Sequence, residues 1–186
     1  MITKNIKVGI INYGIGNIRS LSNTITKIGV IPDIVTNPEH LNLYDKIILP
    51  GVGAFNEAMR LINKMNWRNA IIEYALERRK PILGICLGMQ ILASYGFEHN
   101  KCEGLNLIPG EVKNLKELGC KFSTPHIGWN ELYPNNDKKV WKNKILNNSL
   151  IGKSFYFIHS FVCLTKNPNS TIAVCNYSGI SIPAIV

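Results

Sequence analysis

Residues 81–90 constrain the fold of this chain more than any other stretch. They open with an apolar run, Pro81 to Ile85, which predicts a short buried strand, and the apolar spacing from Leu87 to Leu92 predicts a helix. Between the two lies Gly84-Ile85-Cys86-Leu87-Gly88, a cysteine counterpart of the G-x-S-x-G nucleophile elbow. The turn in such an elbow is sharp and strained, so larger side chains two residues either side of the nucleophile would collide. The pattern therefore predicts a strand, a tight turn and a helix with a nucleophile at the corner.

Cys86 is the candidate nucleophile of this elbow. At a helix N-terminus, unpaired backbone N–H groups and the helix dipole stabilise a thiolate. The alternative is a buried structural cysteine in an ordinary strand-turn-helix, and the two flanking glycines favour the nucleophile. The five cysteines are odd in number and form no C-x-x-C pair, which argues against a disulfide framework and a zinc site. We expect neither a metal nor a cofactor.

Composition limits the class of protein. At 186 residues and 46% hydrophobic, the chain is expected to form one domain, residues 1–186, with a sizeable core. No apolar run is long enough to span a membrane, and residues 1–7 lack the apolar core of a secretory signal, so a cytoplasmic location without membrane association is expected. The net charge of +9 is compatible with nucleic-acid binding. The basic residues are scattered, however, with short clusters only at 78–80 and 138–139, so no nucleic-acid partner is expected. The positive net charge could still attract a phosphorylated substrate or an acidic partner, and this alternative stays open.

The first half of the chain alternates apolar strand-like runs with helix-like segments. Predicted strands cover residues 7–12, 30–35, 46–49 and 81–85, and predicted helices cover residues 17–28, a segment through 58–62, and 67–79. This order implies right-handed crossovers and an α/β fold with a doubly wound, mainly parallel sheet. Ligands bind at the carboxyl ends of such strands, where Cys86 and the loop Gly51-Val52-Gly53 both fall. The two glycines of that loop would let backbone N–H groups point into a crevice as an oxyanion hole requires, although an ordinary connecting loop explains them equally well.

The second half has a different character. Short strands are predicted at residues 111–115, 127–132, 155–159, 171–176 and 181–186, with a short helix over 140–146. The segment from Glu98 to Cys102 is expected to be a loop, and residues 104–110 a turn-rich connector. We therefore expect mixed or antiparallel strands that extend or flank the first sheet.

Several motifs together resemble one family over residues 7–186. They are Pro50-Gly51-Val52-Gly53, Gly84-Ile85-Cys86-Leu87-Gly88-Met89-Gln90, Gly104-Leu105 with Ile108-Pro109-Gly110, Pro125-His126-Ile127-Gly128-Trp129-Asn130, and Tyr156-Phe157-Ile158-His159-Ser160. The chain resembles the class I (triad) glutamine amidotransferases, whose sheet is flavodoxin-like. Among them it is most similar to the glutaminase subunits of imidazole glycerol phosphate synthase, which act in histidine biosynthesis.

The resemblance implies a glutaminase mechanism. Cys86 would attack the carboxamide of glutamine, giving a glutamyl thioester and ammonia. The N–H of Leu87 would supply one oxyanion donor, and the Val52-Gly53 peptide would supply the other after reorienting. Gly51, Gln90 and Glu98 would bind the substrate, with Glu98 as the partner of its α-ammonium group. Gln90 would equally suit a helix surface.

The resemblance also implies a partner. Ammonia would pass to a (β/α)8-barrel synthase subunit of a heterodimer, which makes imidazole glycerol phosphate and an aminoimidazole carboxamide ribotide. Positions near that docking face would be Asn12, Asn17, Trp129 and Asn130. Asn12 stands where the family often carries aspartate, so the contact that this position makes with the partner is in doubt.

One expected feature of the family does not occur within the 186 residues. The catalytic base and its orienting carboxylate come from a C-terminal His-Pro-Glu, expected beyond Val186, so the chain reads as C-terminally truncated, with an exposed sheet edge. None of the four histidines, His40, His99, His126 and His159, has a context that suits the base. The chain is therefore either a fragment of a normal amidotransferase or an inactive, amidotransferase-like binding subunit. If the chain is an enzyme, one alternative to the histidine pathway stays open: a paralogue that supplies ammonia for amidination of a nucleotide sugar or nonulosonate.

Overall fold

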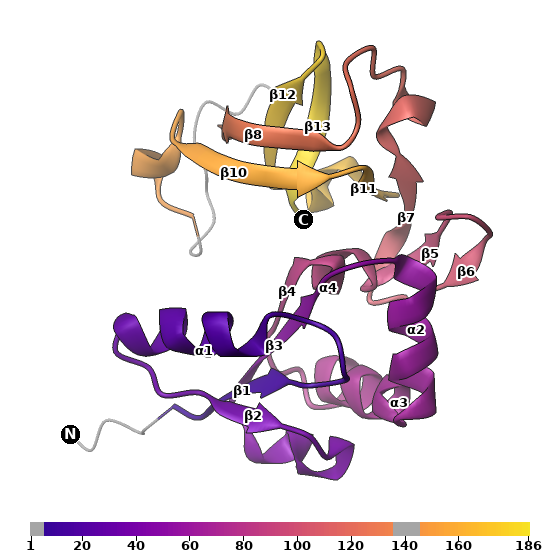
Figure 1. Ribbon diagram of the computed structural model, residues 1–186. Coiled ribbons are helices and arrows are strands. Elements are labelled where there is room, and N and C mark those ends of the chain that lie inside the picture. Colours follow the sequence, from indigo (N-terminus) through magenta and orange to yellow (C-terminus); the bar gives the residue numbers. More distant parts are fainter. Residues whose placement is uncertain (1–5, 136–145) are drawn as a thin grey trace. The chain divides into compact units, whose positions relative to one another are not determined.

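The chain folds into two compact units. The computed structural model describes residues 6–135 and 146–186. The first unit comprises residues 1–96 and 101–108, and the second comprises 97–100 and 109–186. In Figure 1 the longer helices and the strands β1 to β4 belong to the indigo-to-magenta part, whereas the orange and yellow part is built mainly from strands. The basic cluster at 138–139 lies outside the described residues. The helix expected over residues 140–146 also lies outside them, except for its last residue.

A parallel sheet forms the centre of the first unit. Its strands run in the order β2-β1-β3-β4, and every neighbouring pair is parallel. The strands are β1 (Val8–Ile11), β2 (Asp33–Val35), β3 (Lys46–Gly51) and β4 (Ile82–Cys86). Gly51 is the register partner of Cys86, so the glycine loop and the elbow leave the sheet at the same edge. The predicted α/β fold is confirmed.

Helices accompany this sheet. They are α1 (Ile18–Lys27), α2 (Phe55–Lys64) and α3 (Trp67–Ile72), which a short π-helical segment η2 (Glu73–Glu77) continues, and a 3-10 helix η1 (Pro38–Leu43). The helix α1 begins as predicted, because the Asn17 side-chain oxygen accepts a hydrogen bond from the Ser20 N–H at 3.2 Å. The 3-10 helix η1 was not predicted.

Both faces of the sheet are covered. Ile10 of β1 and Ile48 of β3 form a buried cluster with Ile25 of α1. Because successive strand residues point to opposite faces, their neighbours Ile11 and Leu49 lie on the other face, where they are also fully buried. Burial on both faces is the property of a doubly wound sheet.

The prediction that β4 is a buried strand is wrong. Leu83 is 55% exposed and Ile85 is 36% exposed. β4 ends the order of the sheet, and its Gly84 face is covered by α4 (Leu87–Gln90), since a Cβ on Gly84 would lie 2.6 Å from the Met89 Cα. Leu83 and Ile85 lie on the opposite face of β4, where the cover is incomplete.

The segment after the elbow also differs from expectation. The helix α4 was predicted to reach Leu92 but ends at Gln90, because the Leu92 N–H donates to the Met89 carbonyl at 3.2 Å and so leaves the α-helical pattern, and the chain then pairs with residues 105–107. The Leu105 N–H donates to the Ile91 carbonyl at 2.8 Å and the Leu107 N–H to the Leu92 carbonyl at 2.9 Å. An antiparallel hairpin, β5 (Ala93–Gly96) with β6 (Cys102–Glu103), follows where only a loop and connector were expected.

The second unit is antiparallel wherever its described strands pair with one another. β8 pairs with β10, β7 with β11, and β12 with both β13 and β9. The strands are β7 (Ile108–Asn114), β8 (His126–Glu131), β9 (Tyr133–Pro134), β10 (Ser154–His159), β11 (Phe161–Thr165), β12 (Ala173–Tyr177) and β13 (Ile180–Ile185), with 3-10 helices η3 (Leu115–Leu118), η4 (Asn148–Leu150) and η5 (Pro168–Ser170). A core cluster that includes Leu115, Val162 and Ile182 holds these strands together. Of the mixed or antiparallel strands expected in the second half, the antiparallel alternative is confirmed, although β11 was not predicted.

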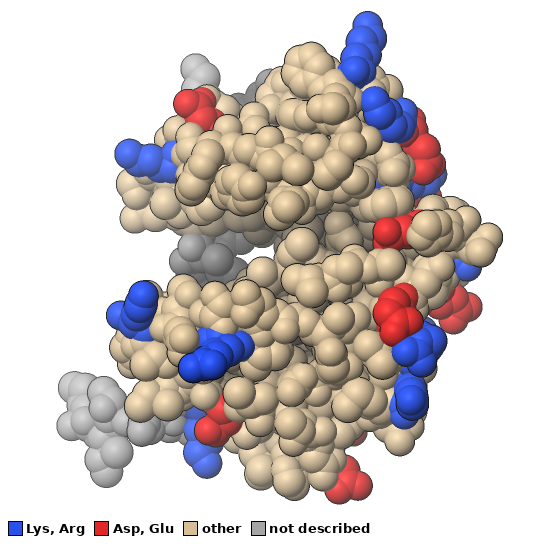
Figure 2. Space-filling view, viewed as in Figure 1, with Lys and Arg blue, Asp and Glu red and all other residues tan. Residues whose placement is uncertain are grey.

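The surface agrees with the scattered charge of the sequence. On the face drawn in Figure 2, Lys and Arg side chains stand apart from one another and are interspersed with acidic ones. Within residues 6–135 and 146–186, no helix combines the length and the apolar character needed to cross a bilayer.

Candidate active site

Cys86 occupies the strained corner that the elbow pattern predicts. It is the last residue of β4 and directly precedes α4, with φ +55° and ψ −117°. A non-glycine residue rarely adopts this conformation, and such strain is concentrated at functional sites. The side chain is exposed, so the sulfur is open to a ligand.

Three glycines around Cys86 are required by close backbone contacts. A Cβ on Gly84 would lie 2.6 Å from the Met89 Cα, and one on Gly88 would overlap the carbonyl oxygen of Leu49. A Cβ on Gly51 would lie 2.9 Å from the Gly88 nitrogen. The neighbouring atoms are mostly backbone and cannot move aside cheaply. The collision expected from the G-x-C-x-G pattern is therefore present in the fold.

The glycine loop lies beside the elbow. Gly51 ends β3 opposite Cys86, and Val52 is 49% exposed. Gly53 has φ +92°, and no atom lies within 4 Å of where its Cβ would be. Leu87 is the first residue of α4, so its N–H has no acceptor within the helix. The structure thus brings together the thiol and the two backbone segments expected to donate to an oxyanion.

Tyr13, which the sequence did not single out, lies beneath this site. It is fully buried, and its hydroxyl oxygen is 2.7 Å from the position of a Cβ on Gly51. Burial raises the pKa of Tyr13 strongly, and the charge of the Cys86 thiolate raises it further. The only sign of Tyr13 in the sequence is an aromatic residue after the first predicted strand, next to Gly14. That its side chain reaches β3 cannot be predicted without knowing the order of the strands.

The other predicted substrate residues fall in different units. Gln90 is the last residue of α4 and belongs with Cys86 in the first unit, whereas Glu98 belongs to the second. Gln90, but not Glu98, therefore belongs to the same compact unit as the nucleophile.

The predicted docking residues are likewise divided. Asn12 and Asn17 lie in the first unit, where each accepts a local hydrogen bond, from the N–H of Gly14 and of Ser20 respectively. Trp129 and Asn130 lie on β8 of the second unit. Trp129 is 71% exposed, but the Asn130 amide is engaged on the other side of the strand, where it donates to the Asn176 carbonyl at 2.9 Å.

Two histidines of the second unit, His126 and His159, lie within hydrogen-bond distance of each other. His126 is fully buried, its Nδ1 lies 3.1 Å from Nε2 of His159, and its Nε2 lies 2.8 Å from the Asn130 side-chain oxygen. The Nδ1 of His159 faces the Phe161 carbonyl at 3.1 Å. Burial, together with the charge of His126, lowers the pKa of His159. Both rings are committed to this network, which supports the expectation that neither serves as the base.

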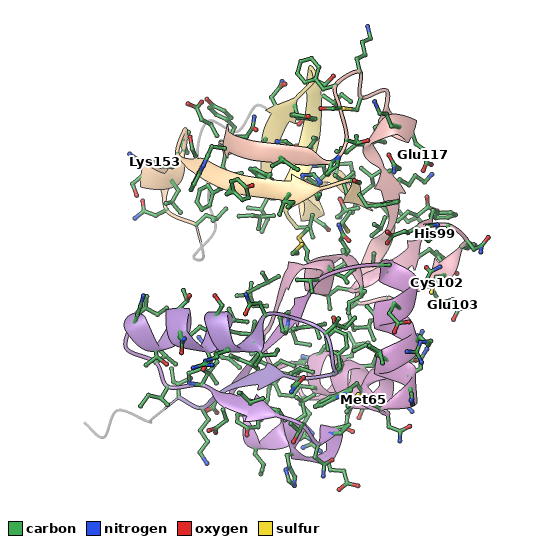
Figure 3. The ribbon with its side chains drawn as sticks, in the orientation of Figure 1. Met65, His99, Cys102, Glu103, Glu117 and Lys153 are labelled. Atoms are coloured by element: carbon green, nitrogen blue, oxygen red, sulfur yellow. The ribbon has the colours of Figure 1, made fainter. Side chains whose placement is uncertain are left out.

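The remaining cysteines differ from Cys86 in their surroundings. Cys163 and Cys175 are buried, which raises the pKa of each thiol to about 11. Cys102 lies on β6 in the hairpin and not at the strand edge that carries Cys86 (Figure 3), and partial burial raises its pKa. Among the described residues, no group of His, Cys, Asp and Glu side chains is arranged to hold a metal ion.

Solved structures share this fold. A crystal structure described as a glutamine amidotransferase matches 96% of the chain with a TM-score of 0.63 at 14% sequence identity, and covers 89% of that protein. The structure of PurLQS from Thermotoga maritima matches 95% of the chain with a TM-score of 0.64 at 19% identity, and covers 78% of that protein. At these identities the likeness establishes the fold alone.

Sequence comparison gives the family. The model of the class-I glutamine amidotransferase family matches residues 9–185. A relative named imidazole glycerol phosphate synthase subunit HisH 1 from Legionella pneumophila (strain Paris) is 37% identical over 96% of this chain and 85% of its own length. Another HisH 1, from Campylobacter jejuni subsp. jejuni serotype O:23/36 (strain 81-176), is 42% identical over 86% of this chain and 77% of its own length. This chain belongs to the class I glutamine amidotransferase family, and within it to the imidazole glycerol phosphate synthase HisH subunits.

Proposed function

We propose that this chain is a glutaminase subunit in which Cys86 is the nucleophile. The observation that carries the proposal is the elbow itself, with an exposed thiol at φ +55° between two glycines that close contacts require. The sulfur attacks the carboxamide carbon of glutamine, and collapse of the tetrahedral intermediate expels ammonia and leaves a glutamyl thioester. Water then hydrolyses the thioester to glutamate.

The oxyanion of that intermediate would be bound by two backbone groups. The N–H of Leu87 is one, and the N–H of Gly53 is the other once the Val52-Gly53 peptide turns inward. The exposure of Val52 and the open space where a Cβ on Gly53 would lie support such a movement. One oxyanion donor typically contributes about 3 kcal/mol to transition-state stabilisation.

The amino-acid end of glutamine would be held by Gln90 and Glu98, and the Gly51 backbone would line the substrate site beside the sulfur. Glu98 would pair with the α-ammonium group. This assignment requires the two units to act as one amidotransferase domain, which the family match over residues 9–185 supports. The base that accepts the thiol proton is expected from the His-Pro-Glu segment that the family resemblance places beyond Val186.

A (β/α)8-barrel cyclase would be the partner that receives ammonia, as the family resemblance implies. The relatives' names, subunits of imidazole glycerol phosphate synthase, support the existence of a partner subunit. An apolar face on β8 and β10 supports a protein partner. It consists of Ile127, Trp129, Tyr156 and Ile158, each more than half exposed. Trp129 is the register partner of Tyr156, and their ring centroids are 5.6 Å apart. A biosynthetic role of this kind would place the protein in the cytoplasm.

The role of Cys86 as the nucleophile can be tested by chemical labelling. A diazoketone analogue of glutamine should alkylate Cys86, identified by mass spectrometry of its peptide, and L-glutamine should protect it where D-glutamine does not. Cys86→Ala should abolish the labelling, and Cys102→Ala, the matched control at a partly exposed cysteine, should leave it unchanged. Labelling that L-glutamine does not prevent, or that persists in Cys86→Ala, would contradict the proposal.

The pathway needs a separate experiment. A histidine auxotroph that lacks its HisH subunit should grow when it receives the full-length gene. Absence of growth, with a stably expressed protein, would instead favour the paralogue that serves sugar amidination.

A further inference from the structure

Tyr13 carries a buried hydroxyl that the resting structure does not use. The side chain is fully buried, and within residues 6–135 and 146–186 its hydroxyl has no hydrogen-bond partner. Leaving such a group unsatisfied costs roughly 1–3 kcal/mol, and most buried polar atoms in folded proteins have a partner. A phenylalanine would fill the same space without this cost, so the hydroxyl needs a reason.

The position of the hydroxyl suggests that reason. It lies against Gly51, 2.7 Å from where a Cβ would be, and the Gly88 nitrogen lies 2.9 Å from the same point. The phenol oxygen therefore sits on the buried side of the glycine loop, next to the first turn of the elbow helix. Gly51 is the register partner of Cys86, so this is the inner wall of the catalytic corner.

The peptide group explains what a donor at this wall can do. The N–H and C=O of a trans peptide point in opposite directions. When a peptide of the Gly51-Val52-Gly53 loop turns its N–H toward a substrate oxygen, its carbonyl turns toward the protein interior. A buried carbonyl needs a donor. Gly53, at φ +92° with open space around it, gives the loop the freedom to make this turn.

We propose that Tyr13 is a positioning residue of the oxyanion loop: its buried hydroxyl donates a hydrogen bond to the loop carbonyl that turns inward when the loop presents an N–H to the reacting carbonyl of glutamine. The inference rests on the proposed glutaminase function. Because its pKa is raised, the phenol keeps its proton beside the Cys86 thiolate and remains a donor.

An aldehyde analogue of glutamine, glutamate γ-semialdehyde, isolates this step. The Cys86 thiolate attacks the aldehyde carbon, a C–S bond forms, and the π pair of the C=O bond moves to oxygen. The resulting oxyanion occupies the oxyanion hole and takes a proton from water, so no leaving group or catalytic base is required. The dissociation constant is measured as protection of Cys86 from iodoacetamide. Alkylation by iodoacetamide itself forms no oxyanion and reports only the thiolate and its access.

Tyr13→Phe removes the hydroxyl alone. We expect aldehyde binding about tenfold weaker, the effect of one hydrogen bond, with an unchanged alkylation rate and an unchanged or higher Tm. Tyr74→Phe is the matched control, because Tyr74 is also fully buried but donates to the Tyr44 carbonyl at 3.2 Å. It should lower the Tm and leave aldehyde binding unchanged.

The outcomes separate the two proposals. Equal aldehyde affinity in wild type and Tyr13→Phe overturns the role of Tyr13 while leaving the glutaminase intact. A lowered Tm in Tyr13→Phe also overturns the role of Tyr13, since the hydroxyl would then have a partner in the resting fold. An equal loss of alkylation rate and aldehyde binding overturns it as well. Failure of the wild type to bind the aldehyde at all overturns the proposed function, and the inference with it.

Discussion

At the scale of single residues, the glycines of the elbow carry the most specific information. Gly84 and Gly88 are explained by contacts that a Cβ would make with neighbouring backbone, and these contacts exist only because Cys86 turns the chain back on itself. Glycines elsewhere in the chain have other reasons. Gly29 has φ +89° with open space around it, so only its backbone conformation favours glycine.

This contrast predicts two different costs. Gly88→Ala should destabilise the fold by about 3 kcal/mol or more, because the new methyl group would overlap the Leu49 carbonyl and the backbone must shift. Gly29→Ala should cost only about 1–2 kcal/mol, the price of a left-handed conformation for an L-residue. The free energies of unfolding in urea measure both. Similar costs for the two variants would show that the elbow is not packed as described.

The nucleophile was predictable because its signal is local. Two glycines, an apolar strand and a helix-like run stand within ten residues of Cys86, and each reports on the same turn. Tyr13 was not predictable, because its significance depends on β1 lying beside β3 and on a hydroxyl that reaches Gly51. Neither property leaves a trace in the residues around Tyr13.

At the scale of elements, the sequence predicted strands where apolar runs are long and missed those defined by pairing. The strands β1 and β3 are hydrophobic runs buried on both faces, which any burial argument finds. The hairpin β5–β6 and the strand β11 are short, and their strand character comes from their partners. Periodicity also misjudged β4, because an apolar run does not reveal which of its faces is covered.

The exposed face of β4 gives a prediction at this scale. Leu83→Ala should cost less than about 1 kcal/mol in this chain, because the side chain is more than half exposed. Leu49→Ala, on the neighbouring strand β3, should cost about 2–5 kcal/mol, because that leucine is fully buried. Urea unfolding at several protein concentrations measures both and detects self-association through the apolar face. A cost at Leu83 equal to that at Leu49 would mean that this face is covered in solution.

At the scale of the whole molecule, the division into two units was the least predictable feature. No linker, charge run or change to low complexity marks it, and residues 97–100 join the second unit while 101–108 return to the first. The chemistry-bearing residues are distributed across that division. Cys86, the glycine loop and Gln90 belong to the first unit, whereas Glu98 and the apolar β8–β10 face belong to the second. Local patterns identify such residues one by one but cannot say which of them share a framework.

The β8–β10 face carries the last prediction. Trp129 is 71% exposed and rests edge-on against Tyr156, an arrangement that offers a large rigid surface to a partner. Tryptophan and tyrosine dominate binding energy when a partner excludes water from them. Trp129→Ala should therefore weaken binding of a (β/α)8-barrel cyclase subunit by about 2 kcal/mol, or roughly thirtyfold, measured by calorimetry. Phe122→Ala is the matched control, because Phe122 is 56% exposed in the same unit but lies outside β8 and β10. Equal losses in the two variants would assign the partner to another surface. An unchanged affinity in Trp129→Ala would do the same, and the exposed aromatic face would then need a different occupant.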